Sequence, residues 1–472
     1  MVRRRSPVQI WQTAYCYSFL FHNDKIILNK SERRDEMHKL TMAEIAKFQK
    51  DYHEKAPNNV AKLAVVNNGL LNASYNHEGA NKLNRTFSIE VPTDNVTNQK
   101  QSGRCWLFAA LNTLRHKFAQ TNKAKNFTLS QSYLFFWDRI ERANIFFENI
   151  IETATQPLDD RVVQSYMAAP DTDGGQWAMA VSLIRKYGLV PSYAQAESFT
   201  ANNTSAFNQA LNMKLRQDAL ILRNLVKNNK LDEAEEKRQE FLSAVYQMAV
   251  IAFGEPVQKF DLEFRDDEGK YHMDANLSPL DFFHNYFEDD LDDYVVLFNA
   301  PDHEFDKLYS LPFEDNVVGG SPVKFLNTKI DNLKAAAIAQ LKAGETIWFG
   351  CDVGKASDRQ NGILSRDLYL TDLVLGIKTN LSKKERLLTR ASGSTHAMTL
   401  VGVDLVNDNP RQWKVENSWG EKAGKNGYFV MDDAWFDEYL FKVVVKKQYL
   451  PEKLVKIWEG PATAVKPWDS MA

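Results

Sequence analysis

A cysteine at the start of an apolar stretch is the residue of this chain best suited to nucleophilic chemistry. Cys105 opens the run Cys-Trp-Leu-Phe-Ala, and the apolar pattern predicts a helix over about 104–120. The N-terminus of a helix carries a partial positive charge and free N–H groups, which favour a thiolate. Gln99 lies six positions earlier, and its side-chain amide together with the backbone N–H of Cys105 would form an oxyanion hole. Asn98 is the weaker candidate for the same donor.

The base that this nucleophile needs lies near the other end of the chain. His396 begins an apolar run that predicts a strand, and Asn417 ends the next predicted strand. A histidine can serve as base and acid in acyl transfer, and an amide side chain can fix its productive tautomer. Trp419 would shield the His–Asn contact from water. His116 lies eleven positions along the Cys105 helix, roughly 16 Å away at ~1.5 Å per residue, which is too far to act.

The chain order Cys, His, Asn is that of the papain-type cysteine peptidases. Asn-Ser-Trp-Gly at 417–420 and Asn-Gly-Tyr at 426–428 resemble that family, and Ser-Gly-Arg-Cys-Trp-Leu-Phe-Ala at 102–109 resembles its bleomycin hydrolase and aminopeptidase C branch. The resemblance extends from about Thr41 to the C-terminus. It implies an α+β, papain-like fold of two lobes, one helical and one β-rich and barrel-like. It also implies a thiol hydrolase that works through an acyl-enzyme on the cysteine.

Two further features follow the pattern of this family. Gly174 and Gly175 resemble the pair on which papain-like enzymes bind the substrate backbone as an added strand, although a plain turn explains two glycines equally well. In the branch named above, subunits form a hexameric barrel, and the carboxylate of a C-terminal arm, here that of Ala472, holds the α-amine of the substrate. The Pro-Trp-Asp segment at 467–469 resembles this arm. Ser470 replaces a proline, however, and about three terminal residues are absent, so at ~3.3 Å per residue the carboxylate would stop about 10 Å short.

These features predict a thiol aminopeptidase that removes N-terminal residues from peptides, with no metal and no organic cofactor. The shortened arm leaves an alternative open, in which longer peptides are cut internally as by an endopeptidase or oligopeptidase. A nucleic-acid-binding assembly is a remote alternative, because the net charge of −3 and the acidic segment 288–293 oppose it. That segment lacks the central glycine of a calcium loop, and we expect a solvated loop or helix end rather than a metal site.

The composition is typical of a globular protein of the cytoplasm, since 44% of its 472 residues are hydrophobic and 25% are charged. No apolar run approaches the ~20 residues that span a bilayer, and we expect no membrane association. Three cysteines do not make a disulfide framework. We expect Cys351 to be structural in a buried strand, and free thiols in a reducing cytosol are a simpler interpretation than a pair with Cys16.

Residues 1–36 are expected to be a non-native or disordered extension. Their apolar stretch is interrupted and lacks a cleavage site, which excludes a signal peptide, and Met37 makes a better start. A capping box at Thr41–Glu44 then opens a helix over about 41–56. Further helices are predicted at 131–149, at 177–187 and within 204–252, and strands from 345 onward. The remaining segments are a helical lobe with the cysteine helix at 37–200, an inserted helical and acidic subdomain at 201–325, a β-rich lobe with His396 and Asn417 at 326–460, and the arm at 461–472.

Overall fold

The computed structural model describes residues 38–287 and 290–472, which divide into two compact units. The smaller unit takes the chain up to Tyr75 together with Tyr369–Thr379, and the larger unit takes Asn76–Leu368 and Asn380–Ala472. All candidate site residues lie in the larger unit. The extension at 1–36, the start at Met37 and Cys16 lie outside the described residues.

The smaller unit is helical. Its helices are α4 (Met42–His53), α5 (Ala56–Asn68), α6 (Leu70–Ser74) and α16 (Thr371–Leu375). The capping box predicted at the start of α4 is confirmed, because the Thr41 hydroxyl accepts from the Glu44 N–H at 3.2 Å and the Glu44 carboxylate accepts from the Thr41 N–H at 2.8 Å. These two bonds satisfy backbone donors that a helix N-terminus otherwise leaves without partners.

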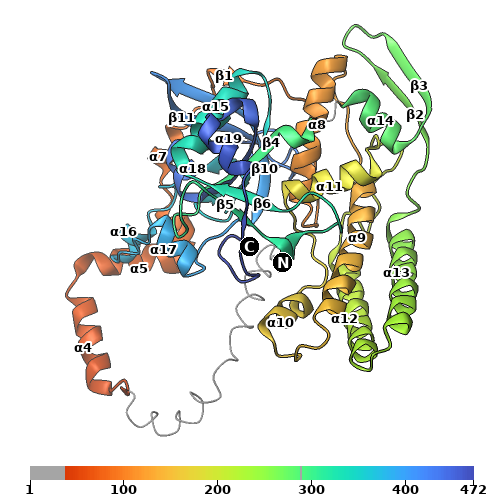
Figure 1. Ribbon diagram of the computed structural model, residues 1–472. Helices are drawn as coiled ribbons and strands as arrows, with labels where there is room; N and C mark the ends of the chain where they lie inside the picture. Colours follow the sequence, from red (N-terminus) through yellow and green to blue (C-terminus); the bar gives the residue numbers. More distant parts are fainter. Residues whose placement is uncertain (1–37, 288–289) are drawn as a thin grey trace. The chain divides into compact units, whose positions relative to one another are not determined.

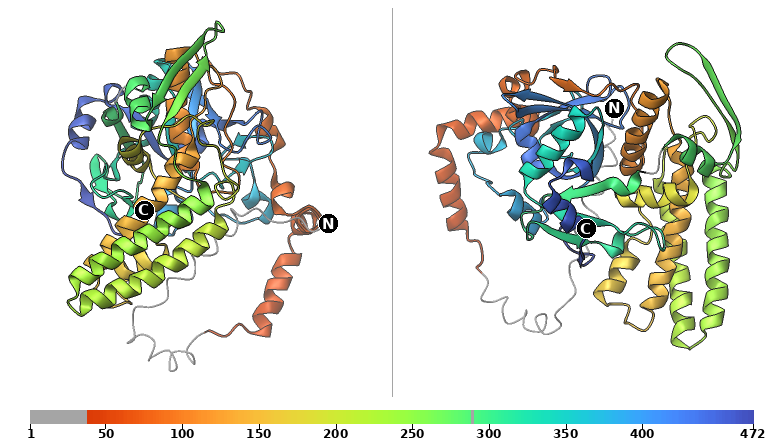
Figure 2. Two further views of the ribbon diagram at one scale, coloured as in Figure 1. Left: turned by 90° about the vertical axis from the view of Figure 1, so that its right-hand side faces the viewer. Right: turned by 45° about the horizontal axis from the view of Figure 1, so that its top comes forward.

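Helices gather on one side of the larger unit, as Figure 1 shows. The predictions of helices at 104–120, 131–149 and 177–187 are confirmed by α8, α9 and α11, and the charged stretch 204–252 forms two long antiparallel helices, α12 and α13. These two pack with α9 into a bundle that stands out in Figure 2. The helices of this unit up to residue 290 are α7 (His77–Asn81), α8 (Cys105–Asn122), α9 (Gln131–Glu152), α10 (Arg161–Ala168), α11 (Trp177–Tyr187), α12 (Ser205–Lys227), α13 (Leu231–Phe253) and α14 (Pro279–Tyr286).

A 12-stranded mixed sheet forms the other side of the larger unit. Its central strand β10 begins at His396 and pairs antiparallel with β7 and β11. The path runs β14-β5-β6-β4-β13-β7-β10-β11-β12-β9-β8, with β1 added at β10. The strands are β1 (Ile89–Glu90), β4 (Tyr294–Phe298), β5 (Lys307–Ser310), β6 (Lys324–Asn327), β7 (Ile347–Cys351), β8 (Ser357–Asp358), β9 (Ile363–Leu364), β10 (His396–Val406), β11 (Asn409–Glu416), β12 (Tyr428–Asp432), β13 (Leu440–Lys446) and β14 (Thr463–Ala464).

Smaller elements complete the larger unit. Strands β2 (Phe260–Arg265) and β3 (Tyr271–Leu277) form a separate hairpin. Helices α15 (Ile330–Lys342), α17 (Lys383–Leu388), α18 (Asp433–Tyr439) and α19 (Glu452–Trp458) accompany the sheet. Because β4–β6 belong to the large sheet, the segment 201–325 contributes to both sides of this unit. The division of the chain into lobes and an insertion stays a prediction.

Helix α8 is fixed against the sheet by buried side chains. The indole N–H of Trp348 in β7 donates to the carbonyl oxygen of Trp106 at 3.0 Å, and both tryptophans are almost fully buried. Thr399 in β10 donates to the carbonyl oxygen of Ala109 at 3.5 Å. Tight packing of this kind leaves the first turn of α8 little freedom to move. In the described ranges, no helix is long and apolar enough to cross a membrane.

Candidate active site

Cys105 is the first residue of α8 and is 9% exposed. The loop before it is locked by Arg104, whose fully buried guanidinium binds the carboxylate of Glu197 through two hydrogen bonds of 3.0 and 2.7 Å. A bidentate pair of this kind fixes both position and orientation. The thiol is therefore presented at a helix N-terminus by a rigid loop.

His396 and Asn417 form a hydrogen-bonded pair within the sheet. The imidazole Nε2 lies 3.0 Å from Asn417 Oδ1, and the fully buried Asn417 also accepts from the N–H of Ser418 at 2.8 Å. The ring of Trp419 lies 4.9 Å from the imidazole, and the guanidinium of Arg359 lies 4.4 Å from the Trp419 ring. The structure thus places Trp419 where it can shield the pair from water.

The end of β11 is tied to the cysteine helix just before Asn417. Arg115 of α8 donates to the buried carboxylate of Glu416 at 2.6 Å, and His116 Nε2 lies 3.1 Å from the other carboxylate oxygen. These partners hold the pKa of Glu416 below its usual range against the opposing effect of burial. His116 therefore acts in a buried contact between helix and strand.

Helix α8, which begins at Cys105, packs on β10, which begins at His396. The backbone N–H of Ala397, the residue after His396, interacts with the Cys105 thiol, as do the N–H groups of Trp106 and Cys105 itself. Burial raises the pKa of Cys105 to about 11 and lowers the pKa of His396 to about 4, so burial favours the neutral form of each group. Asn417 and the three N–H groups act in the opposite direction. Transfer of the thiol proton to the imidazole creates two opposite charges together, which then stabilise each other.

Gln99 lies in the turn that precedes Cys105, and its side chain is buried, with 6% exposed. Its Nε2 donates to the carbonyl oxygen of Ser102 at 2.6 Å, and its Oε1 accepts from the Ser418 hydroxyl at 2.7 Å. These contacts orient the amide and leave one N–H of Nε2 for a ligand. Asn98 instead accepts from the N–H of Lys100 at 2.9 Å, so of the two amides it is Gln99 that is buried beside the cysteine loop.

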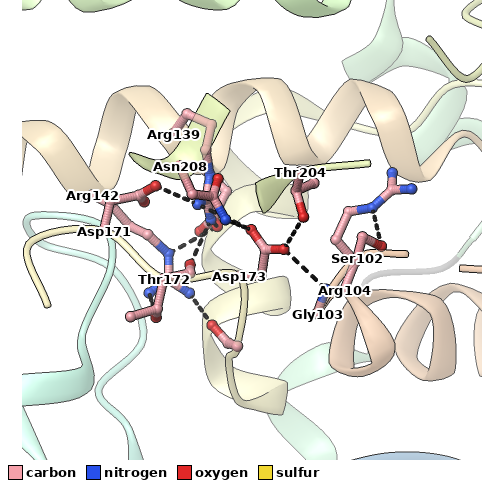
Figure 3. Close-up of polar contacts among 12 residues, drawn as sticks. Ser102, Gly103, Arg104, Arg139, Arg142, Asp171, Thr172, Asp173, Thr204 and Asn208 are labelled. Carbon is pink, nitrogen blue, oxygen red and sulfur yellow. Dashed lines mark hydrogen bonds and ion pairs between the residues drawn. The ribbon is translucent and has the colours of Figure 1, made fainter. Parts of the chain in front are cut away.

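Asp173 joins the loop before Cys105 (the cysteine loop) to the loop that carries Gly174 and Gly175 (the glycine loop), as Figure 3 shows. This role of Asp173 was not predicted from the sequence. Its carboxylate accepts from the N–H of Gly103 at 2.9 Å, from the side-chain amide of Asn208 at 2.6 Å and from the hydroxyl of Thr204. Its backbone carbonyl accepts from the indole of Trp106 at 2.6 Å. The signal in the sequence is the position of an aspartate directly before the glycine pair. A buried carboxylate with this many donors is a strong clamp.

The two candidate substrate-binding glycines differ in their surroundings. A Cβ on Gly174 would meet no atom within 4 Å, whereas a Cβ on Gly175 would lie 2.6 Å from two carbons of the Trp106 indole. Gly174 O accepts from Arg142. In the described part of the chain, the backbone N–H and carbonyl of Gly175 have no hydrogen-bond partner. They are free to pair with an extended peptide.

The C-terminal arm is anchored shortly before its end. His303 lies between the carboxylates of Asp302 and Asp469, at 3.2 and 3.1 Å, and these contacts raise the pKa of His303 to about 9. Ser470 donates to Asp302, and Arg390 donates to the carbonyl oxygen of Asp469 at 2.7 Å. The terminal residue, Ala472, donates from its N–H to the carbonyl oxygen of Asp469 at 3.3 Å, so the last residues form a turn.

Among the residues that the structure describes, no three His, Cys, Asp or Glu side chains are grouped to hold a metal ion. Cys351 lies in β7, is fully buried with a free thiol, and burial raises its pKa well above the usual range. A buried thiol without an activating group is inert.

A thiol at a helix N-terminus, packed against the strand that carries an asparagine-paired histidine, is the arrangement of a cysteine hydrolase of the papain type. The family model described as the Peptidase C1-like family matches residues 39–472. The chain is 53% identical over 436 residues to aminopeptidase E of Lactobacillus helveticus, a match that covers 92% of this chain and 100% of that protein. It is 45% identical to aminopeptidase C of Listeria innocua, over 92% of this chain and 98% of that one. The crystal structure of pepW from Lactobacillus rhamnosis matches with a TM-score of 0.90 and 45% identity, over 92% and 98% of the two chains. This chain belongs to the Peptidase C1-like family.

Proposed function

We propose that this chain is a cysteine aminopeptidase that removes N-terminal residues from peptides through an acyl-enzyme on Cys105. The observation that carries the proposal is that the Cys105 thiol, at the start of α8, interacts with the N–H of Ala397, the residue that follows the asparagine-paired His396. The relatives named aminopeptidases E and C, which this chain matches over nearly their whole length, support it.

The geometry supports a two-step acyl transfer. His396 takes the proton from Cys105 as Sγ forms a bond to the scissile carbonyl carbon. The oxyanion receives hydrogen bonds from the remaining N–H of Gln99 Nε2 and from the backbone N–H of Cys105. His396 then protonates the leaving amine as the C–N bond breaks. Water, deprotonated by the same imidazole, hydrolyses the thioester and restores the thiol.

The finer architecture is part of the proposal. We infer a two-lobed papain-like fold with an inserted helical subdomain, a cytoplasmic location and a homohexameric assembly. The match to the pepW structure supports the fold. The assembly and the location are supported by the family resemblance alone.

Selection of substrates with a free α-amine would come from the arm. The contacts of His303, Arg390 and Asp302 hold residues 469–470, and the ring of Trp468 lies 3.8 Å from the guanidinium of Arg161. The terminal carboxylate lies only a few residues beyond this anchor. A fixed carboxylate would bind the α-ammonium of a peptide as a charge-assisted pair and exclude longer chains.

Endopeptidase activity is the second candidate function, and the end of the arm favours it. The turn that returns the Ala472 N–H to Asp469 shortens the reach of the arm. A carboxylate held back in this way would leave room for residues N-terminal to the scissile bond.

One peptide, offered with a free and with an acetylated N-terminus, tests these two activities. Mass spectrometry of the products should show stepwise loss of N-terminal residues from the free peptide only, and the Cys105→Ala variant should give no product. In the His303→Ala variant, which loses the ion pairs of the arm, we expect internal cleavage of the acetylated peptide to increase. Internal cuts by the wild type in both peptides would replace the aminopeptidase with an endopeptidase.

A further inference from the structure

A lysine is buried in the sheet beside the candidate active site. Lys442 lies in β13 and is 1% exposed, opposite Gly350 of β7 and Phe298 of β4. Its ammonium lies 4.5 Å from the ring of Phe325 and 5.4 Å from that of Phe298. Burial lowers the pKa of Lys442 to about 8, so the group carries its charge at neutral pH. The sheet therefore holds a cation between two aromatic rings.

This ammonium has few partners. It donates to Gln176 Oε1 at 2.6 Å, which is its one hydrogen-bond acceptor in the described part of the chain. An ammonium has three donors, so two N–H groups remain for a ligand. The negative charge of Glu314 attracts the ammonium of Lys442 electrostatically. The Glu314 carboxylate accepts its hydrogen bond from Gln176 Nε2, at 2.6 Å, and not from the lysine. A buried cation whose direct partner is a neutral amide is costly, and an anion would complete its environment.

The position of Lys442 connects it with two segments of the candidate active site. Gln176 directly follows Gly175, whose backbone is free to pair with a peptide. On the other side, Gly350 pairs with Ala397, the residue after His396. A Cβ on Gly350 would lie 3.5 Å from Lys442 Cδ, an ordinary contact distance, so the lysine stem runs beside this glycine. The ammonium thus lies between the glycine loop and the histidine strand.

We propose that Lys442 forms the floor of a side-chain subsite that selects an acidic residue, aspartate or glutamate, on the N-terminal side of the scissile bond. The subsite rests on the proposed function, since it needs a peptide held along Gly175. A carboxylate accepts from the two remaining N–H groups, or displaces Gln176 Oε1, because it is a stronger acceptor than a neutral amide. The rings of Phe298 and Phe325 line the base of the subsite around the ammonium.

Binding to the inactive Cys105→Ala chain tests the subsite without turnover. Peptides that differ only by Glu or Gln at the N-terminal residue, directly before the scissile bond, are compared by calorimetry. We expect the Glu peptide to bind about 10- to 100-fold more tightly than the Gln peptide, as for a charge-assisted hydrogen bond. Lys442→Met should bring this ratio to about 1 and leave the Gln peptide within about 3-fold. Lys456→Met, at an exposed position of α19, should keep the preference.

A second variant guards against a failure of Lys442→Met to fold. Gln176→Glu supplies a carboxylate of the protein's own to the ammonium, and we expect it to remove the preference for Glu peptides. Equal binding of the Glu and Gln peptides, or a preference that survives in Lys442→Met, overturns the subsite. Cleavage is scored separately with the wild type. Absence of any cleavage together with a Lys442-dependent preference would refute the proposed peptidase and leave the subsite standing.

Discussion

Replacement of Gly175 by alanine would place a methyl group 2.6 Å from two carbons of the Trp106 indole. Ordinary contact begins at about 3.4 Å, so the loop or the indole must move by about 0.8 Å. The indole is fully buried and donates to the carbonyl oxygen of Asp173 at 2.6 Å, which resists such a movement. Overpacking of this kind costs about 1–3 kcal/mol.

A displaced glycine loop would also weaken the proposed pairing with substrate. Two backbone hydrogen bonds from Gly175, at about 0.5–1.5 kcal/mol each, amount to about 1–3 kcal/mol of binding. At 1.36 kcal/mol per factor of ten, kcat/KM of Gly175→Ala should fall by about 5- to 150-fold. The free energy of unfolding, measured with urea, should fall by about 1–3 kcal/mol.

Gly174→Ala is the matched control, since a Cβ there would meet no atom within 4 Å. Its free energy of unfolding should stay within about 0.5 kcal/mol of the wild type. Wild-type values of both kcat/KM and stability for Gly175→Ala would refute the packing of this glycine on Trp106 and its part in substrate binding.

Three further results are expected. Gln99→Ala should lower kcat by about 100- to 1,000-fold with little change in KM, because it removes one oxyanion donor; a loss under about 5-fold in steady-state kinetics would exclude that role. Burial lowers the pKa of His396 to about 4, so kcat/KM should be constant above about pH 5 and should fall as the imidazole is protonated below about pH 4. A fall of kcat/KM centred near pH 6.5 would contradict the burial of His396. The charge of Asp173 raises the pKa of Cys105, so Asp173→Asn should lower it. Alkylation of Cys105 by iodoacetamide at pH 8 should then be faster than in the wild type. An unchanged or slower rate would contradict the electrostatic effect of Asp173 on the thiol.

Much of the site could be predicted from local sequence. The apolar run after Cys105 and the strand that begins at His396 each carry a short-range pattern, and α8 and β10 begin within a residue of their predicted positions. The strand predicted to end at Asn417 ends at Glu416, although it begins earlier than predicted. The capping box at Thr41 is also local, since its partners are three residues apart. Signals of this kind depend on residues that are close together in the sequence, so they can be recognised without knowledge of the fold.

The remaining features depend on contacts between distant segments. Asp173 meets Gly103 seventy positions away, and Lys442 meets Gln176 across 266 positions. A lysine in a strand pattern is normally an exposed residue, so nothing in its neighbours indicates that Lys442 is buried. The strands of 294–327 likewise join the large sheet through pairing with β13, which periodicity does not reveal.

The most direct test of the account is to trap the acyl-enzyme. A peptide ester is mixed with the wild type, the reaction is quenched with acid within its first turnover, and the protein is digested and weighed by mass spectrometry. The account predicts that the acyl mass appears on the fragment with Cys105, and that it is absent from the Cys105→Ala variant. Product formation with no acyl mass on Cys105, or with the mass on Cys351, would contradict the assignment of the nucleophile.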